Sequence, residues 1–155
     1  MYISHPKHVP FEYNKITENI FLGTNQCCKV HFKKSLLKKG IKADVSLEKE
    51  RIDAAFGVDY FLWLPVLDKK SPTQKQLMIG AKAIKEFVES KIKVYVHCKR
   101  GHGRSPTLVA AYFILMGLNV AEAVKKIKKK RGIHMTLPQI KALNKFEKVF
   151  KGKGL

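Results

Sequence analysis

The chain has 155 residues and a formal net charge of +19 at pH 7, with 31 basic and 12 acidic residues. This length predicts one domain over residues 1–155, large enough to bury a hydrophobic core. The apolar runs are too short for a transmembrane segment, the first residues lack the apolar stretch of a secretory signal, and three cysteines suit a reducing compartment, so we expect a cytoplasmic protein.

The first half of the chain alternates between strand and helix patterns. Residues 1–16 are expected to form an irregular lead-in, followed by a short strand at 20–23. A helix is expected from residue 25 or 26 to residue 37. Two further strands are predicted at 43–47 and 61–67, the second apolar throughout and therefore buried.

The second half begins with a helix over 73–89, whose apolar residues recur at helical spacing. A fourth strand at 93–97 leads to a helix at 104–117. Two more helices are expected, one from residue 119 or 120 to 130 and one at 137–150. Strands that alternate with helices indicate an α/β domain with a largely parallel central sheet of about four to five strands, flanked by helices.

One loop carries a recognisable chemistry. It lies between the fourth strand and the next helix and reads His97-Cys98-Lys99-Arg100-Gly101-His102-Gly103-Arg104-Ser105. A thiol attacks only as its thiolate, which converging backbone N–H groups and a helix N-terminus both favour. The planar fork of Arg104 suits two phosphoryl oxygens. Cys98 is therefore the candidate nucleophile, and the loop from Lys99 to Arg104 is the candidate phosphate cradle.

Other residues of this loop would support the thiolate. Gly101 and Gly103 allow backbone angles that turn successive N–H groups inward. Ser105 can donate its hydroxyl to the Cys98 sulfur and help it leave when a phospho-cysteine is hydrolysed. We expect the His97 ring to hold the loop and tune the thiolate, without transferring protons.

The segment VHCKRGHGRSPTLVAAYFILMG, residues 96–117, resembles the signature loop and following helix of the cysteine-dependent protein tyrosine phosphatase superfamily. The compact dual-specificity branch, as in small archaeal and bacterial enzymes, fits best over about residues 19–150. The resemblance implies a protein tyrosine phosphatase-like fold and hydrolysis of phosphate monoesters through a phospho-cysteine intermediate. It also implies that the reaction uses no metal and no cofactor.

The leaving oxygen needs a proton donor, and no acidic residue lies between positions 90 and 121. Asp68 is the best candidate, because it follows an apolar strand, and α/β sheets place functional groups at such strand ends. Asp44, inside a strand, and Asp59, before one, are poorer candidates. The alternative for Asp68 is a loop residue that caps the next helix. In the dual-specificity branch a W-x-P-x-x-D…P pattern carries the general acid, and this chain matches it with Trp63, Pro65, Asp68 and Pro72.

The loop sequence also bears on the substrate. The basic loop is similar to the CKxGKGR loops of phosphoinositide phosphatases, but His102 replaces the second lysine. RNA 5′-triphosphatases of the superfamily have a different HCTHGxNRTG loop. The resemblance therefore implies phosphorylated proteins as substrates, with phosphotyrosine and also phosphoserine or phosphothreonine accepted. A phospholipid phosphatase or an RNA 5′-triphosphatase remains an alternative, as does a phosphate-binding module without catalysis.

The remaining polar and cysteine residues give weaker signals. The basic run 125–131 is interpreted as a solvated helix face, with anionic lipid or RNA as alternative partners of the basic surface. The resemblance implies a polar residue near the site that helps place the water, and Gln139 is the candidate, with His134 as the alternative.

Cys27 and Cys28 are expected to be small buried helix residues that do not bridge each other, or else to protect Cys98 after oxidation. We expect a monomer.

Overall fold

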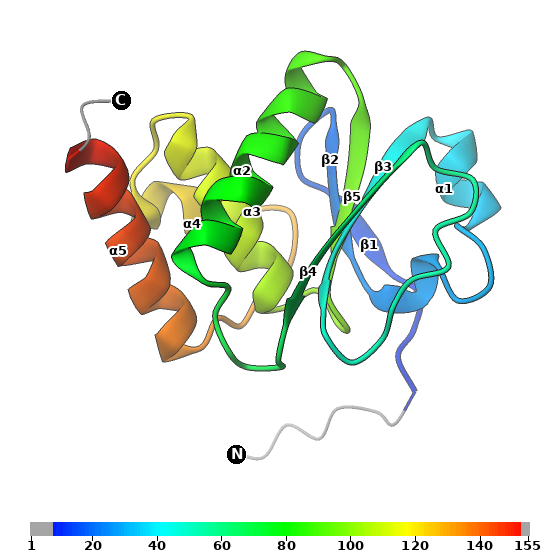
Figure 1. The fold of residues 1–155 in the computed structure, drawn as a ribbon, viewed down its shortest axis with the longest axis horizontal. Coiled ribbons are helices and arrows are strands. Elements are labelled where there is room, and N and C mark those ends of the chain that lie inside the picture. Colours follow the sequence, from blue (N-terminus) through cyan, green and yellow to red (C-terminus); the bar gives the residue numbers. More distant parts are fainter. Residues whose placement is uncertain (1–7, 153–155) are drawn as a thin grey trace.

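The computed structural model describes residues 8–152, which form a five-stranded sheet with helices on both faces (Figure 1). The strands are β1 (Tyr13–Lys15), β2 (Ile20–Gly23), β3 (Ile41–Glu48), β4 (Tyr60–Val66) and β5 (Lys93–His97). Their order across the sheet is β1-β2-β5-β3-β4, with β1 antiparallel to β2 and all other pairs parallel. The predicted α/β class and strand number are confirmed.

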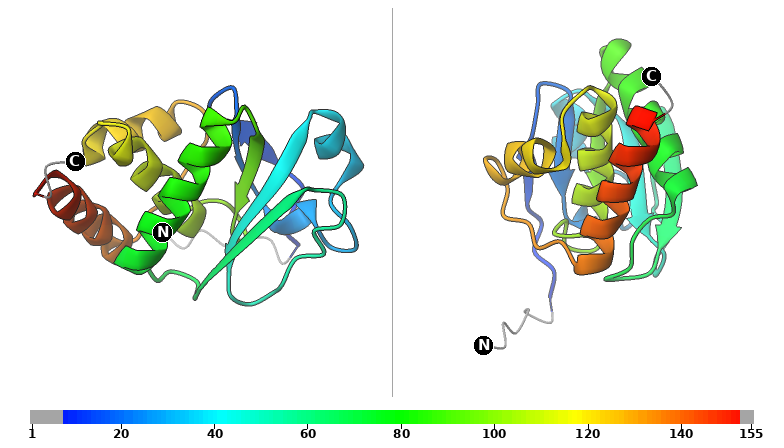
Figure 2. Two further views of the ribbon diagram at one scale, coloured as in Figure 1. Left: turned by 45° about the horizontal axis from the view of Figure 1, so that its top comes forward. Right: turned by 90° about the vertical axis from the view of Figure 1, so that its left-hand side faces the viewer.

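The helices form two unequal layers. They are the short 3-10 helix η1 (Asn25–Cys27), α1 (Lys34–Lys38), α2 (Gln74–Glu89), α3 (Arg104–Leu115), α4 (Val120–Lys128) and α5 (Leu137–Gly152). Helices α2 to α5 gather on one side of the sheet and α1 on the other (Figures 1 and 2). Within residues 8–152, no helix is both long and apolar enough to cross a membrane.

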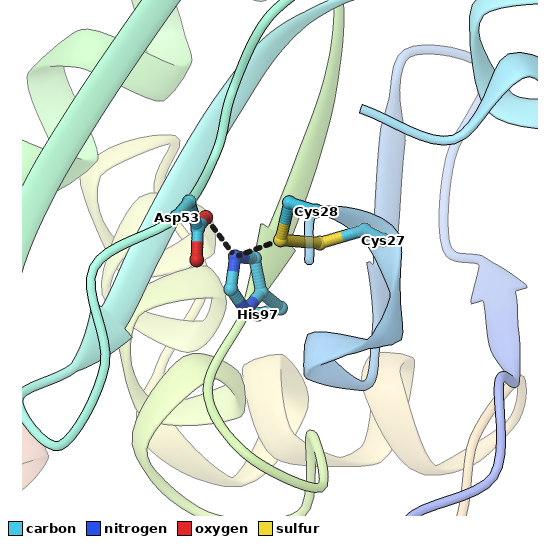
Figure 3. A group of neighbouring side chains, drawn as sticks. All are labelled: Cys27, Cys28, Asp53 and His97. Atoms are coloured by element: carbon cyan, nitrogen blue, oxygen red, sulfur yellow. Dashed lines mark hydrogen bonds and ion pairs between the residues drawn. A yellow bond between two sulfur atoms is a disulfide. The ribbon is translucent and has the colours of Figure 1, made fainter. Parts of the chain in front are cut away.

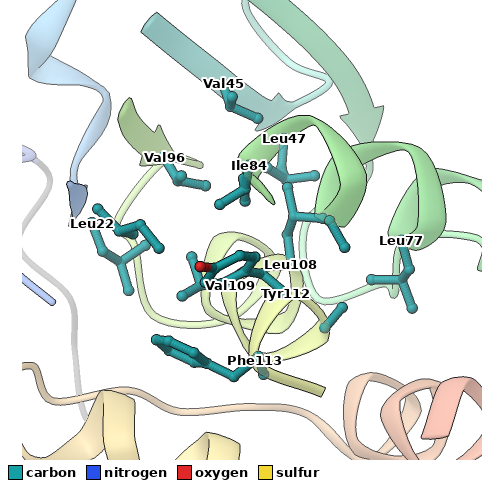
Figure 4. Packing of buried hydrophobic residues seen from close by; sticks show 14 of the residues in the cluster. Leu22, Val45, Leu47, Leu77, Ile84, Val96, Leu108, Val109, Tyr112 and Phe113 are labelled. Carbon is teal, nitrogen blue, oxygen red and sulfur yellow. The ribbon is translucent and has the colours of Figure 1, made fainter. Parts of the chain in front are cut away.

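Alternation along the central strand β5 divides the core in two. Val94 and Val96 belong to the larger cluster, which packs against α2 and α3 (Figure 4). Tyr95 belongs to a smaller cluster with Phe32 and Leu36, on the α1 side. Because side chains alternate along a strand, His97 points to the same side as Tyr95. This alternation decides which side chains lie behind the loop that follows β5.

Three predictions for the first half were wrong. The strand predicted to be buried at 61–67 is β4, which lies at the edge of the sheet with most of its side chains exposed. The expected helix at 25–37 is only η1 and α1, because its backbone groups bond to a distant loop: Ala54 donates to the Cys28 carbonyl and Phe32 donates to the Phe56 carbonyl. The lead-in is not irregular throughout, because it contains β1, which pairs with β2. Residues 1–7 of that lead-in lie outside the described residues.

The parallel strands β2, β5, β3 and β4 all end at one edge of the sheet. Four loops therefore meet there, each following the last residue of a strand. The groups that the sequence placed at strand ends are brought together at this edge, as in other parallel α/β sheets.

Candidate active site

The loop after β5 wraps around the Cys98 sulfur. The backbone N–H of Gly101 points at Sγ from 3.3 Å, and the Ser105 hydroxyl oxygen lies 3.2 Å from it. Burial alone would raise the pKa of the Cys98 thiol, but the Arg104 charge and the hydrogen bonds from Ser105 and Gly101 lower it below its usual value. The loop thus favours the thiolate in a nearly buried position.

The loop needs glycine at positions 101 and 103 for two different reasons. Gly101 has φ 73°, a left-handed conformation that glycine tolerates, and a Cβ there would lie 2.5 Å from the Gly23 carbonyl oxygen. Gly103 has φ −132°, which other residues also adopt, so backbone freedom is not its role. A Cβ at position 103 would instead lie 3.0 Å from the Gln139 side chain. The expectation for Gly101 is confirmed and that for Gly103 is corrected.

Arg104, the first residue of α3, is buried and anchored by the loop after β3 and by the end of β4. Its Nη1 donates to both carboxylate oxygens of Glu50, at 3.1 and 2.8 Å, and to the Val66 carbonyl at 2.7 Å. Burial would raise the pKa of Glu50, but the hydrogen bond from Arg104 lowers it below its usual value. The guanidinium is therefore fixed in orientation beside Cys98, where it can receive an anion.

Asp68 follows β4 and lines the pocket that also contains Cys98. Its Oδ1 lies 3.6 Å from Arg104 Nη2, too long for a hydrogen bond, and its side chain is 63% exposed. Its backbone N–H donates to Glu50 at 3.1 Å. Thr73 caps α2 with a reciprocal bond pattern with Gln76, so Asp68 is not the helix cap. Its Oδ1 accepts a hydrogen bond from the Lys69 backbone N–H at 2.9 Å, and Asp68 lines the same pocket as Cys98, where a bound substrate would lie.

The pocket has a volume of about 470 Å³, and both Cys98 and Asp68 line it. Gln139 also lines the pocket and is buried. Its side-chain NH2 group donates to the Lys70 carbonyl, and its side-chain oxygen accepts from the Thr136 backbone N–H. Thr136 in turn donates to the Lys69 carbonyl. The start of α5 therefore holds the loop that carries Asp68. The structure brings the predicted Gln139 to the site.

The remaining cradle residues also line the pocket, and three of them are basic. Lys99, Arg100, His102 and Gly103 all line the pocket, as does His134, whose N–H donates to the His102 carbonyl. The His102 and His134 rings meet edge to face, with centroids 5.7 Å apart. Every candidate site residue predicted from the sequence, with the exception of Ser105, Gly101 and the buried His97, thus lines one pocket.

His97 lies behind the loop and is fully buried. Its Nε2 is 2.6 Å from Asp53 Oδ2 (Figure 3). The same Nε2 is 3.2 Å from Asp44 Oδ1, and Nδ1 is 3.0 Å from the Cys98 carbonyl oxygen. Burial would lower the pKa of His97, but the two carboxylates raise it well above its usual value. The ring faces away from the pocket, which agrees with an expected role in holding the loop.

Sequence reasoning missed several residues that shape this site. Arg131, which was assigned to a solvated face, is buried, and its guanidinium donates to the carbonyls of Gly101 and Arg100 and to the Asn14 side chain. Glu50 and Asp53 were missed because they are distant in sequence from the loop. The only available signal for them was their position just after β3, at the carboxyl edge of the sheet.

The two adjacent cysteines also differ from expectation. Cys27 and Cys28 are buried, as predicted, but they form a disulfide with each other. Within residues 8–152, the free cysteine is Cys98. The prediction that the pair does not bridge is therefore wrong, and the two sulfurs lie on the α1 side of the sheet, next to His97.

Comparison with known families agrees with this geometry. The family described as "Dual specificity phosphatase, catalytic domain" matches residues 20–149. The chain belongs to the dual-specificity phosphatase family. It is thus a compact member of the cysteine-dependent protein tyrosine phosphatase superfamily, as the loop motif implied.

Two curated relatives and one solved structure are similar to this chain. The chain is 25% identical to "Probable protein tyrosine phosphatase type IVA B" of Dictyostelium discoideum, over 90% of this chain and 76% of that protein. It is 39% identical to human "Phosphatidylglycerophosphatase and protein-tyrosine phosphatase 1" over 50% of this chain and 39% of that protein. The crystal structure of PTPMT1 in complex with PI(5)P superposes with a TM-score of 0.78 and 26% identity, covering 92% and 99% of the two chains.

Replacing Ser105 with alanine is expected to raise the pKa of Cys98 in this phosphatase family member, because the hydrogen bond to the sulfur is lost. Alkylation of Cys98 by iodoacetamide, followed against pH, measures this pKa. A matched Ser71→Ala variant, in the loop before α2, should leave the alkylation profile unchanged. An unchanged profile in Ser105→Ala would contradict the contact.

Replacing Glu50 with glutamine removes the negative charge that anchors Arg104 and puts an NH2 group, which cannot accept from Arg104, in place of one of its two carboxylate oxygens. We expect kcat for phosphate release to fall by about 10 to 100-fold, since a hydrogen bond to a charged group contributes roughly 1.5–3 kcal/mol. Steady-state kinetics measure the effect, with Glu89→Gln on α2 as a control. A full-activity Glu50→Gln protein would show that Arg104 is positioned without Glu50.

Proposed function

We propose that this protein hydrolyses phosphate monoesters through a phospho-cysteine intermediate. The Cys98 thiolate attacks phosphorus in line while Arg104 and the loop N–H groups bind the non-bridging oxygens and their developing charge. Asp68 gives its proton to the leaving oxygen as the ester bond breaks. Water, deprotonated by Asp68, then attacks the phospho-cysteine, and the sulfur leaves as a thiolate that accepts the Ser105 hydrogen bond.

One observation carries this proposal: the Cys98 sulfur is met by the Gly101 N–H and the Ser105 hydroxyl inside a pocket that Arg104 and Asp68 also line. A phosphate-binding module without catalysis would need neither the lowered thiol pKa nor a carboxyl group at the mouth of the pocket. The sequence carries the nucleophile, the guanidinium and the acid together. This combination favours an enzyme over a binding module.

As substrates we propose phosphorylated proteins, with phosphotyrosine accepted and also phosphoserine and phosphothreonine. The family match and the names of the relatives favour this class. We expect the protein to act as a monomer.

A phospholipid headgroup is the second candidate substrate. The human relative's name includes phosphatidylglycerophosphatase, and PTPMT1 has been crystallised with PI(5)P. The pocket of this chain is lined by Lys69, Lys99 and Arg100, which can receive additional phosphates. His102 stands where the lipid-type loop has a second lysine, which favours the protein substrate.

The test compares phosphate release at matched concentrations from a phosphotyrosine peptide, a phosphoserine peptide, a phosphoinositide and a triphosphorylated RNA. Cys98→Ser protein is the blank. A higher kcat/KM for the peptides than for the lipid and the RNA is expected. A preference for the lipid or the RNA would retain the Cys98 chemistry and overturn the proposed substrate class.

A further inference from the structure

Behind the catalytic loop, four side chains that commonly bind metals meet in the interior (Figure 3). They are Cys27, Cys28, Asp53 and His97, and one donor atom of each lies within 4.8 Å of all the others. Their side chains are buried, with Asp53 only 1% exposed and His97 not exposed at all. They come from three separate segments: the end of η1, the loop after β3, and the end of β5.

The donor set suits one class of cation. Two thiolates, an imidazole nitrogen and a carboxylate oxygen match the ligands of four-coordinate Zn²⁺. The Nε2 atom of His97 faces the other donors, 3.7 Å from Cys28 Sγ and 2.6 Å from Asp53 Oδ2. Its Nδ1 faces the Cys98 carbonyl oxygen at 3.0 Å, and a hydrogen bond on the opposite ring nitrogen is how proteins orient metal-binding histidines.

Carboxylate oxygens without a hydrogen-bond partner lie at the same place and are an independent observation in favour of a cation site. Asp53 Oδ1 and both oxygens of the fully buried Asp44 accept no hydrogen bond. A buried carboxylate without a partner is costly, and the single Nε2 proton of His97 cannot satisfy two carboxylates. Arg51 contributes one positive charge nearby, 3.7 Å from Asp53 Oδ1 and 3.5 Å from Cys28 Sγ. A divalent cation among the four donors would give the Asp53 carboxylate a further partner.

We propose that Cys27, Cys28, Asp53 and His97 form a structural Zn²⁺ site when the Cys27–Cys28 disulfide is reduced. A dithiol such as dithiothreitol supplies two electrons and two protons to the Cys27–Cys28 bond, leaving two thiols and its own cyclic disulfide. Zn²⁺ then binds both sulfurs, Asp53 and His97 Nε2, while the two thiol protons and the Nε2 proton pass to solvent. The disulfide and the cation thus compete for the same two sulfurs, and His97 links either state to the catalytic loop.

The test uses Cys98→Ser protein without a tag. The chain has three cysteines, so Cys27 and Cys28 are then its only thiols. After reduction with dithiothreitol and removal of the reductant, Co²⁺ is titrated as the probe. One equivalent is expected to bind with thiolate-to-cobalt charge-transfer absorption and the strong visible bands of tetrahedral cobalt, and Zn²⁺ should displace it.

Variants in the same Cys98→Ser background assign the donors. Replacing both Cys27 and Cys28 with serine should abolish the charge-transfer absorption. Asp53→Asn, which keeps the side-chain shape, should weaken Co²⁺ binding by at least about tenfold. His31→Ala, at an exposed histidine, should leave binding unchanged.

Thermal unfolding gives a second readout. Zn²⁺ in excess should raise the Tm of reduced Cys98→Ser protein, because a cation that binds only the folded state stabilises it. The double serine variant should show no such rise. Absence of charge-transfer absorption in reduced Cys98→Ser protein would overturn the proposal, as would unchanged affinity in Asp53→Asn or a Tm rise that persists without the two cysteines.

Discussion

Cys98→Ser protein is expected to lose turnover and keep anion binding. The serine hydroxyl is not ionised near neutral pH, so the attacking group is lost and kcat falls by on the order of 10⁴-fold or more. The other parts of the cradle, the Arg104 guanidinium and the loop N–H groups, remain in place. Phosphate release and calorimetric binding of tungstate measure the two properties separately.

Two outcomes of this experiment would contradict the account. Turnover comparable with the wild type would mean that the nucleophile is another group. Loss of tungstate binding together with turnover, in a protein that is still folded by circular dichroism, would mean that the cradle depends on the sulfur itself.

Asp68→Asn is expected to slow the reaction according to the leaving group. The amide cannot donate the proton that an alkoxide needs, so release from a phosphoserine peptide should fall by about 10²–10⁴-fold. An activated aryl phosphate, whose leaving oxygen needs little protonation, should be affected much less. Steady-state kcat/KM values for the two substrates give the comparison.

Asp59→Asn is the matched control, since Asp59 is an exposed aspartate at the opposite end of β4. It should leave both rates unchanged. Equal losses on both substrates in Asp68→Asn would show that another group is the acid and that Asp68 acts only through Arg104.

Much of the fold could be predicted because its main elements carry their own patterns. A capping residue, Thr73, directly precedes α2, for example, and β5 has an apolar centre at residues 94–96. The segment after β2 misled the prediction because Cys28, Phe32 and Leu36 recur every four residues, as on a helix. Their side chains are indeed buried together, but the backbone between them bonds to the loop before β4. A tertiary contact therefore decided the conformation.

The same distinction separates the site residues that were predicted from those that were not. Cys98, Arg104 and Ser105 lie within eight residues of one another, and their roles follow from one local loop. Glu50 and Arg131 act on that loop from 54 and 30 residues away, through contacts with Arg104 and Gly101. Only the register of the parallel strands and the packing of α4 bring them there. Arg131 also ends a lysine-rich run, so the sequence pattern did not distinguish this buried arginine from the lysines before it.

The most direct test of the central claim is to trap the covalent intermediate. Ser105→Ala protein, in which breakdown of the phospho-cysteine should be slowed, is mixed with a ³²P-labelled phosphotyrosine peptide and denatured rapidly in detergent. Peptide mapping by mass spectrometry then locates the phosphate. We expect the label on Cys98, and none in Cys98→Ser protein. Label on His97, His102 or another residue, or turnover in Ser105→Ala protein without any labelled protein during the first cycle, would contradict the phospho-cysteine mechanism.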